Sequence, residues 1–159
     1  MSALSLAYDA ADAQVITQDT GAQGYFRMDA LTPRHKRFVG RWTSGLRREL
    51  FQRGDAVAVL PWDVEADRVI LIEQFRPGAI RGTESPWMLE AIAGVVEAVE
   101  TDEAVAHREA SEEAGCTMNA LMPIVSYYPS PGACTEQIRL FIGRLTEAAI
   151  GEVRGVETE

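Results

Sequence analysis

The sequence is poor in the features that mark secreted, membrane-spanning and zinc-binding proteins. Its 159 residues include only two cysteines, Cys116 and Cys134, which are too few and too far apart for a disulfide framework or a zinc site. No apolar run approaches the roughly 20 residues that span a membrane. The N-terminal stretch 1–14 has neither a basic region nor a continuous apolar segment, so it does not resemble a secretory signal. We therefore expect a cytoplasmic protein without membrane association, in which both cysteines are small, buried or half-buried side chains.

Basic residues are scarce relative to acidic ones, which argues against nucleic acid as a partner. The chain has 15 Lys and Arg against 24 Asp and Glu, giving a net charge of −9. The charges are also segregated. The charged residues of segment 21–53 are mainly basic, whereas Arg108 is the one Lys or Arg among the acidic residues of segment 90–113. This distribution suits an anionic substrate held by arginines beside a metal held by carboxylates. Taken alone, it is more typical of a dipolar surface without function.

The length and the apolar runs predict a mixed α+β fold. A chain of 159 residues can bury a sizeable core. We interpret residues 1–53 as a small N-terminal β unit and residues 54–159 as the main domain. Residues 46–53 allow either a short helix or a strand. The other predicted strands are apolar or alternating runs bounded by turn residues, at 25–31, 37–42, 56–62, 68–75, 87–93, 123–128 and 137–145.

One helix is predicted from Asp102 to Ala114, a stretch without Gly or Pro that is rich in Ala and Glu. Thr101 is a candidate N-cap, and Gly115 is a candidate left-handed residue after the last turn. Alanines at every fourth position from 106 to 114 form a stripe of small side chains. Such a stripe would allow the helix to lie close to a sheet.

Three glutamates of this helix share one face. At 100° per residue, Glu109, Glu112 and Glu113 fall within an arc of about 100°. Their charges repel, and within the helix only Arg108, at the edge of that face, relieves the repulsion. A hard divalent cation with oxygen ligands would neutralise them. Without further evidence, a solvated acidic face is the commoner explanation of such a cluster.

The glutamates belong to a longer pattern, G-x5-E-x7-R-E-x-x-E-E-x-G. All seven fixed positions are present, and they are Gly94, Glu100, Arg108, Glu109, Glu112, Glu113 and Gly115. This pattern is identified as the signature box of the Nudix hydrolases. The box also specifies aliphatic residues where this chain has Ala110 and Cys116, a departure that concerns packing rather than chemistry. The resemblance implies an α/β/α sandwich around a mixed β-sheet.

Four further segments resemble the ADP-ribose pyrophosphatases within this superfamily. They cover most of residues 47–143, and Pro131 stands sixteen residues after Gly115, where that family has a proline. The resemblance implies Mg²⁺-dependent hydrolysis of ADP-ribose to AMP and ribose 5-phosphate, with Mn²⁺ as an alternative metal. It also implies a homodimer whose N-terminal unit is exchanged between subunits, with Phe38 and Trp42 as candidate interface residues.

The same resemblance assigns roles to the box. Glu109 and Glu113 would be the principal metal ligands, supplemented by Glu112 and by the backbone carbonyl of Ala93. Arg108 would orient the carboxylates without touching the substrate.

For the nucleotide sugar, the resemblance points to an aromatic ring, two arginines and two carboxylates. Tyr25, Arg48 and Glu49 would contact adenine, since a base stacks well between a ring and a guanidinium group. Arg76, after a strand end, would bind phosphate or ribose, although an exposed surface arginine fits that position equally well. Glu136 would accept hydrogen bonds from the terminal ribose.

The general base is expected at the end of the chain. Carboxylates bound to a metal have little basicity to spare, and the resemblance implies a glutamate in an acidic loop after the last core strand. Alignment on Gly155 favours Glu159, with Glu157 second, and a disordered acidic tail is an equally good interpretation. On this alignment the catalytic domain stops before its expected C-terminal end. A complete chain would then bind metal and substrate but turn over weakly, whereas a longer chain would be fully active.

Two other functions fit the same sequence. One is a pyrophosphatase for another nucleoside diphosphate sugar such as GDP-mannose. The other is a catalytically silent Nudix domain that binds a nucleotide as a sensor. The intact glutamate face argues against this alternative.

Overall fold

The computed structural model describes residues 7–148, and these divide into two compact units. The first unit takes in the residues up to Arg53 together with Ser130–Glu136. The second runs from Gly54 to Pro129 and continues from Gln137. Within the described residues no helix is long and apolar enough to cross a membrane.

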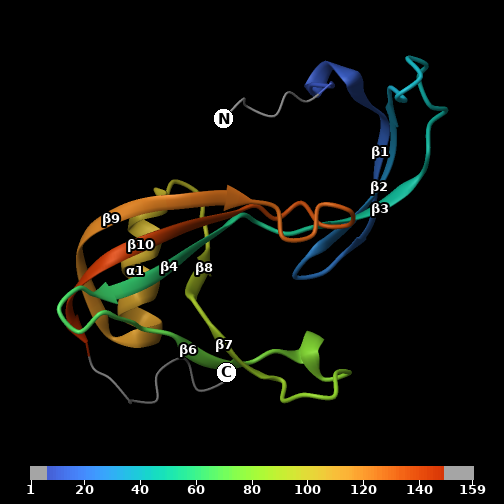
Figure 1. Cartoon of the computed structure of the whole chain (residues 1–159). Helices are drawn as coiled ribbons and strands as arrows, with labels where there is room; N and C mark the ends of the chain where they lie inside the picture. Colours follow the sequence, from blue (N-terminus) through green and yellow to red (C-terminus); the bar gives the residue numbers. More distant parts are fainter. Residues whose placement is uncertain (1–6, 149–159) are drawn as a thin grey trace. The chain divides into compact units, whose positions relative to one another are not determined.

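The first unit is an antiparallel sheet in the order β1-β2-β3, seen as the blue and teal strands of Figure 1. Its strands are β1 (Ala13–Gln23), β2 (Arg27–His35) and β3 (Arg48–Gln52), preceded by a short 3-10 turn, η1 (Ala10–Asp12). The 46–53 segment, for which the sequence allows a helix or a strand, is therefore a strand. We did not predict β1, whose side chains are exposed along its whole length and so give no alternation of apolar and polar residues.

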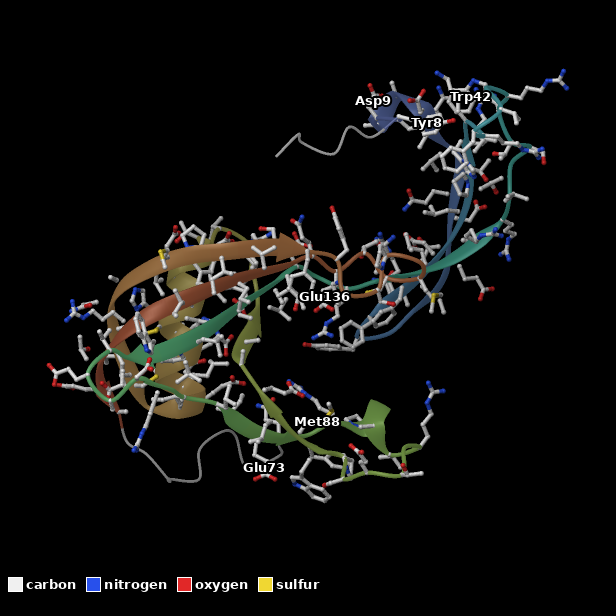
Figure 2. The ribbon with its side chains drawn as sticks, viewed as in Figure 1. Tyr8, Asp9, Trp42, Glu73, Met88 and Glu136 are labelled. Atoms are coloured by element: carbon white, nitrogen blue, oxygen red, sulfur yellow. The ribbon has the colours of Figure 1, made fainter. Side chains whose placement is uncertain are left out.

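The predicted strand at 37–42 is wrong. The backbone there makes only an isolated bridge between Lys36 and Trp42. Backbone hydrogen bonds close it as a turn, since the Arg37 amide donates to the Arg41 carbonyl at 2.7 Å and the Gly40 amide donates to the Arg37 carbonyl at 2.8 Å. The Trp42 ring, labelled in Figure 2, also lies 5.0 Å from the guanidinium carbon of Arg34. Apolar residues in a turn can thus imitate a short strand in the sequence.

Residues 130–136 join the first unit through the backbone of β3. The Phe51 amide donates to the carbonyl of Ala133 at 2.7 Å, and the Thr135 amide donates to the carbonyl of Phe51 at 3.1 Å. This pairing across about eighty residues leaves no local signal, and the sequence did not predict it.

The second unit is built on a mixed sheet in the order β5-β4-β10-β9, with β8 also paired to β4 (Figure 1). Strand β10 runs parallel to β4 and antiparallel to β9. A separate antiparallel pair is formed by β6 and β7. The strands are β4 (Ala56–Asp63), β5 (Arg68–Val69), β6 (Ile72–Phe75), β7 (Trp87–Glu90), β8 (Ile92–Val95), β9 (Cys116–Tyr127) and β10 (Ile138–Ala148), with a 3-10 turn η2 (Pro77–Ala79).

The predicted strands at 68–75 and 87–93 each divide in two. The first run becomes β5 and β6, and the second becomes β7 and β8. Strands β5 and β8 pair with β4, whereas β6 and β7 pair with each other. One apolar run thus serves two sheets, which its hydrophobic pattern does not reveal. The mixed α+β fold that the sequence predicts is confirmed.

Helix α1 (Asp102–Ala114) covers one face of the mixed sheet and is the one α-helix among the described residues. Val105, Ala106 and Ala110 are fully buried and belong to a cluster with Val57, Val59, Ile92, Cys116, Met118 and Phe141. The small alanines bring the helix close to the sheet, as their spacing predicts. Cys116 is buried and Cys134 is half-buried.

The predicted helix ends are confirmed. The Thr101 hydroxyl accepts a hydrogen bond from the Ala104 amide at 3.2 Å, which caps the N-terminus. Gly115 has φ 56° and ψ 34°, and its amide donates to the carbonyls of Ala110 and Ser111. A left-handed glycine therefore closes the helix.

The loop before α1 contains a strained residue, from which a stability prediction follows. Val99 has φ 73° and is fully exposed, so a β-branched side chain adopts a left-handed conformation without any packing in return. We expect Val99→Gly to raise the free energy of unfolding by about 1 kcal/mol, measured by thermal or urea denaturation. The matched control is Val64→Gly in another turn of the same unit, where φ is not positive and the side chain is less exposed. That control should destabilise, and a loss of stability in Val99→Gly would contradict the strain.

Candidate metal centre

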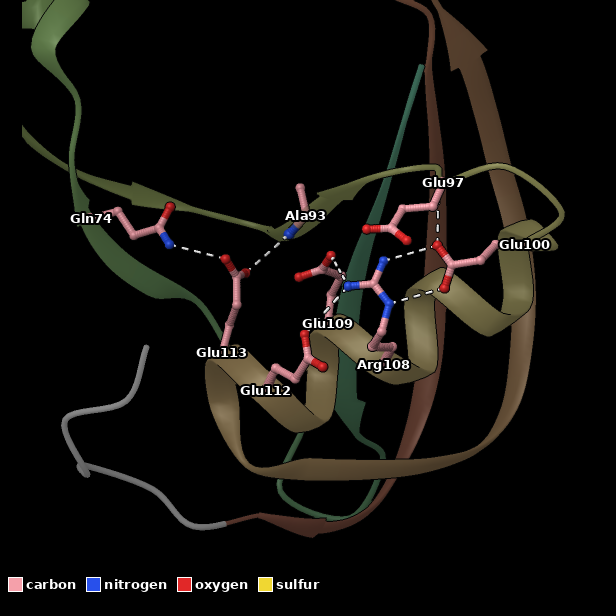
Figure 3. A network of polar contacts seen from close by, with 8 residues as sticks. All are labelled: Gln74, Ala93, Glu97, Glu100, Arg108, Glu109, Glu112 and Glu113. Carbon is pink, nitrogen blue, oxygen red and sulfur yellow. Dashed lines mark hydrogen bonds and ion pairs between the residues drawn. The ribbon is translucent and has the colours of Figure 1, made fainter. Parts of the chain in front are cut away.

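Of the three glutamates on one face of α1, Glu109 and Glu112 contact Arg108, whereas Glu113 contacts residues of β6 and β8 (Figure 3). The Arg108 Nη1 atom lies 2.6 Å from Glu109 Oε1 and 3.3 Å from Glu112 Oε2. Its Nε and Nη2 atoms donate to the two oxygens of Glu100 at 3.0 and 3.1 Å. Arg108 thus contacts three of the carboxylates of the sequence pattern and holds Glu109 and Glu112 by their oxygens.

These contacts change the pKa values of the groups involved. The hydrogen bonds from Arg108 hold the pKa of Glu100 below its ordinary value. The bonds to Glu100 and Glu109 outweigh the partial burial of Arg108 and raise the pKa of its guanidinium group. Glu100 also accepts a hydrogen bond from the Glu97 amide at 3.2 Å, so the ion pair connects the loop before α1 to the helix.

Glu113 lies apart from Arg108, on the side of strands β6 and β8. Its Oε1 accepts a hydrogen bond from Gln74 Nε2 at 3.0 Å, and its Oε2 accepts one from the Ala93 amide at 3.3 Å. Burial raises the pKa of Glu113, although these two hydrogen bonds oppose the shift. The carboxylate is therefore held in a position where its negative charge is not fully compensated.

Gly94 provides the space for Glu109. A β-carbon built on Gly94 would collide with the carboxylate of Glu109, so the absence of a side chain leaves a cradle for that group. This contact explains why the sequence pattern begins with glycine. The carboxylates of Glu109 and Glu113 consequently approach neighbouring residues of one strand, Gly94 and Ala93.

Within residues 7–148, no three His, Cys, Asp or Glu side chains converge on a common point as ligands of one ion. The contacts give the reason, because Arg108 draws Glu109 and Glu112 to one side and Gln74 draws Glu113 to the other. The donor set nevertheless fits a hard divalent cation, which takes oxygen ligands and keeps several waters. The half-buried, incompletely neutralised carboxylate of Glu113 and the cradle at Gly94 are the features that fit.

Arg76 follows the last residue of β6 and is held by Glu90 of β7. Its Nε and Nη2 atoms lie 2.7–3.0 Å from the two oxygens of Glu90, a bidentate ion pair. Arg76 is exposed, as the alternative of a surface arginine expects, and it is also held in this ion pair. Its contact with the substrate stays a prediction, and Glu90, which the sequence analysis did not select, orients its guanidinium group.

The residues predicted to bind the nucleotide belong to the first unit. Tyr25 is 93% exposed and packs edge-on against Phe26. Arg48 donates to the Arg47 carbonyl at 3.1 Å, and Glu49 lies 3.8 Å from Arg47. Tyr25 is thus available to a ligand, and the two β3 side chains have only weak local contacts.

Glu136, labelled in Figure 2, is buried and lies 3.3 Å from Arg53 Nε. A buried carboxylate needs such a partner. Arg53 is a residue that the sequence analysis missed, since nothing in the sequence links it to a position more than eighty residues away. The predicted bases Glu157 and Glu159 lie outside the described residues.

The family model of the NUDIX domain matches residues 52–158 of this chain. The chain belongs to the Nudix hydrolase family. The predicted resemblance to that superfamily, made from the box alone, is therefore confirmed.

Similar proteins agree with this assignment. The ADP-ribose pyrophosphatase of Escherichia coli K12 is 38% identical over 148 residues, which are 93% of this chain and 71% of that protein. The ADP-ribose pyrophosphatase of Haemophilus influenzae is 39% identical over 151 residues, 93% of this chain and 70% of that protein. The GDP-mannose pyrophosphatase of Cronobacter sakazakii is 37% identical over 115 residues, 71% of this chain and 60% of that protein.

A solved structure described as an ADP compounds hydrolase has the same fold. Its TM-score is 0.65 at 20% sequence identity, and the match covers 93% of this chain and 74% of that chain. Nudix hydrolases generally need a divalent metal, which is the class of ion that the glutamate face of α1 fits.

The raised pKa of Glu113 in this Nudix domain predicts a pH-dependent effect on stability. A carboxyl group with a raised pKa contributes stability below its unfolded pKa, and this contribution is lost as the pH rises through the folded pKa. We expect Glu113→Gln, which cannot ionise, to raise the melting temperature at pH 7.5 in EDTA. This gain should vanish at about pH 4, where the Glu113 carboxyl is itself protonated.

The melting temperatures of both proteins are measured by thermal denaturation at the two pH values. Glu103→Gln, at an exposed position in the first turn of the same helix, is the control and should show no gain. A gain for Glu113→Gln that persisted at the lower pH would contradict burial of the charge as its cause.

Proposed function

We propose that this Nudix hydrolase cleaves the pyrophosphate of ADP-ribose in the presence of Mg²⁺, giving AMP and ribose 5-phosphate. The observation that carries the proposal is the complete glutamate face of α1, held by Arg108 beside Gly94. It occurs in a chain 38% identical over 148 residues to an ADP-ribose pyrophosphatase. A catalytically silent domain would have no reason to keep these repelling carboxylates together.

In this proposal, Glu109 and Glu113 hold the metal, with Glu112 and the Ala93 carbonyl as further ligands. A divalent cation, when bound, neutralises phosphate charge and lowers the pKa of a coordinated water. The residues of the chain set its position, because Gly94 leaves room for the Glu109 carboxylate and the Ala93 amide fixes one oxygen of Glu113.

Arg108 acts on the ligands rather than on the substrate. Its side chain forms ion pairs with Glu100, Glu109 and Glu112. In this role it keeps the repelling Glu109 and Glu112 carboxylates in place for coordination.

Five residues are assigned to recognition of the nucleotide sugar. Arg76, already oriented by Glu90, presents a fork of donors that suits a phosphate. Tyr25, Arg48 and Glu49 contact the adenine. Glu136 accepts hydrogen bonds from the terminal ribose.

We further propose a cytoplasmic homodimer, in which residues 1–53 are exchanged so that Tyr25 and Arg48 serve the partner's site. The general base is assigned to Glu159, on the sequence resemblance alone.

A second substrate is supported by one observation, the 37% identity over 115 residues to a GDP-mannose pyrophosphatase. The two substrates share the pyrophosphate chemistry and differ in the groups that the first unit would recognise.

A product assay tests the reaction. The protein should release AMP and ribose 5-phosphate from ADP-ribose with Mg²⁺ but not with EDTA, and it should cleave GDP-mannose more slowly. Glu113→Gln should lower kcat by roughly 100-fold or more, since it removes a ligand charge from the metal, whereas Glu103→Gln should retain turnover. Faster cleavage of GDP-mannose would overturn the substrate, and binding of ADP-ribose without cleavage in saturating Mg²⁺ would favour a sensor.

Arg76 gives a second test. We expect Arg76→Ala to raise KM for ADP-ribose by about 10-fold or more with a smaller change in kcat, because it deletes a charge-assisted contact to the substrate. The control is Arg81→Ala, at an exposed position of the same loop, which should leave both constants unchanged. An unchanged KM in Arg76→Ala would leave Arg76 with only its structural pairing to Glu90.

A further inference from the structure

Gln74 is the side chain that fixes the position of Glu113 from outside the Nudix box. It lies on β6, thirty-nine positions before Glu113 in the chain, and its Nε2 donates to Glu113 Oε1 at 3.0 Å. The Ala93 amide of β8 donates to the other oxygen at 3.3 Å. Figure 3 shows the Glu113 carboxylate between these two donors. Each oxygen of the carboxylate therefore has one hydrogen bond from a different strand.

The orientation of the Gln74 amide is determined by its partner. A carboxylate oxygen only accepts hydrogen bonds, so the amide must turn its NH₂ group to Glu113 and its oxygen away. That oxygen, Oε1, is buried and has no hydrogen-bond partner among the described residues. Buried polar atoms are rarely left without a partner, and those that are indicate an ion, a water or a functional role.

Gln74 differs in burial from the residues next to it on β6. Along β6, Ile72 and Gln74 are half-buried, whereas Glu73 and Phe75 are exposed. Figure 2 shows the Glu73 side chain directed away from the strand pair. Across the ladder, Gln74 is paired with Met88 of β7, which offers no strong hydrogen-bond partner to the amide oxygen. The strand thus places the Gln74 amide against Glu113.

We propose that Gln74 is a positioning residue of the metal site. Its amide nitrogen donates to Glu113 and holds that carboxylate in place for coordination, while its buried oxygen is turned away from the ligand. Partners behind a ligand commonly govern metal affinity as well as activity. This inference rests on the proposed function, in which Glu113 is a ligand.

The test is the affinity of the 159-residue chain for Mn²⁺ alone, without substrate, measured from the electron paramagnetic resonance signal of the free ion. We expect Gln74→Met, which keeps the length of the side chain and removes its polar atoms, to weaken Mn²⁺ binding by about 10-fold or more. Glu73→Gln, on the same strand but exposed, should stay within about twofold of the unmodified protein. An unchanged affinity in Gln74→Met, or an equal loss in Glu73→Gln, would overturn the proposal.

The double variant separates this inference from the proposed function. If Gln74 acts through Glu113, Gln74→Met should weaken binding much less in a Glu113→Gln background than alone. Full additivity of the two losses would overturn the positioning role. If Glu113→Gln by itself leaves Mn²⁺ affinity unchanged, the proposed ligand role of Glu113 fails, and the inference fails with it. If Glu113→Gln weakens binding and Gln74→Met does not, only the inference fails.

A second variant covers the case in which Gln74→Met does not fold, as judged by circular dichroism. Gln74→Glu keeps the volume and the acceptor oxygen but replaces the donor by a second carboxylate facing Glu113. We expect a lower melting temperature than the unmodified protein in EDTA and a larger rise on adding Mn²⁺, because the cation relieves the new repulsion. A rise equal to that of the unmodified protein would contradict the placement of Gln74 beside the metal.

Discussion

The repulsion between three carboxylates on α1 is the constraint on which the rest of the site depends. Like charges three and four residues apart destabilise a helix, so Glu109, Glu112 and Glu113 need partners from outside their own face. Arg108 contacts the first two, and donors from β6 and β8 contact Glu113. Burial nevertheless raises the pKa of Glu113, because its two hydrogen bonds do not fully compensate the charge. What remains is a face of oxygen atoms whose charge a divalent cation would balance.

The packing of α1 decides which strand this face meets. Ala106 and Ala110 are fully buried, and their small side chains let the helix lie close to the sheet. At that separation the Glu109 carboxylate reaches Gly94, where any side chain would collide with it. The glycine, the alanine stripe and the glutamates of the Nudix box are therefore parts of one packing arrangement. Larger residues in the stripe would move the carboxylates away from β8 without altering a single ligand.

Features that depend on residues a few positions apart could be predicted, and those that depend on pairing partners could not. The bounds of α1 and its caps at Thr101 and Gly115 are as predicted, because capping and helix propensity act within one turn. The strand β1 was missed, and the runs at 68–75 and 87–93 were not expected to divide. In these cases backbone pairing rather than the side-chain pattern sets the strand limits.

The sequence by itself determined the helix, the spacing of its glutamates and, through the seven fixed positions of the box, the family of the protein. Only the tertiary structure decided which partners the charged side chains have. Gln74 and Ala93 meet Glu113 from 39 and 20 positions away, and Arg76 and Glu90 meet because β6 pairs with β7. Such contacts follow from sheet pairing and core packing between distant segments, whose geometry no local pattern of residues contains.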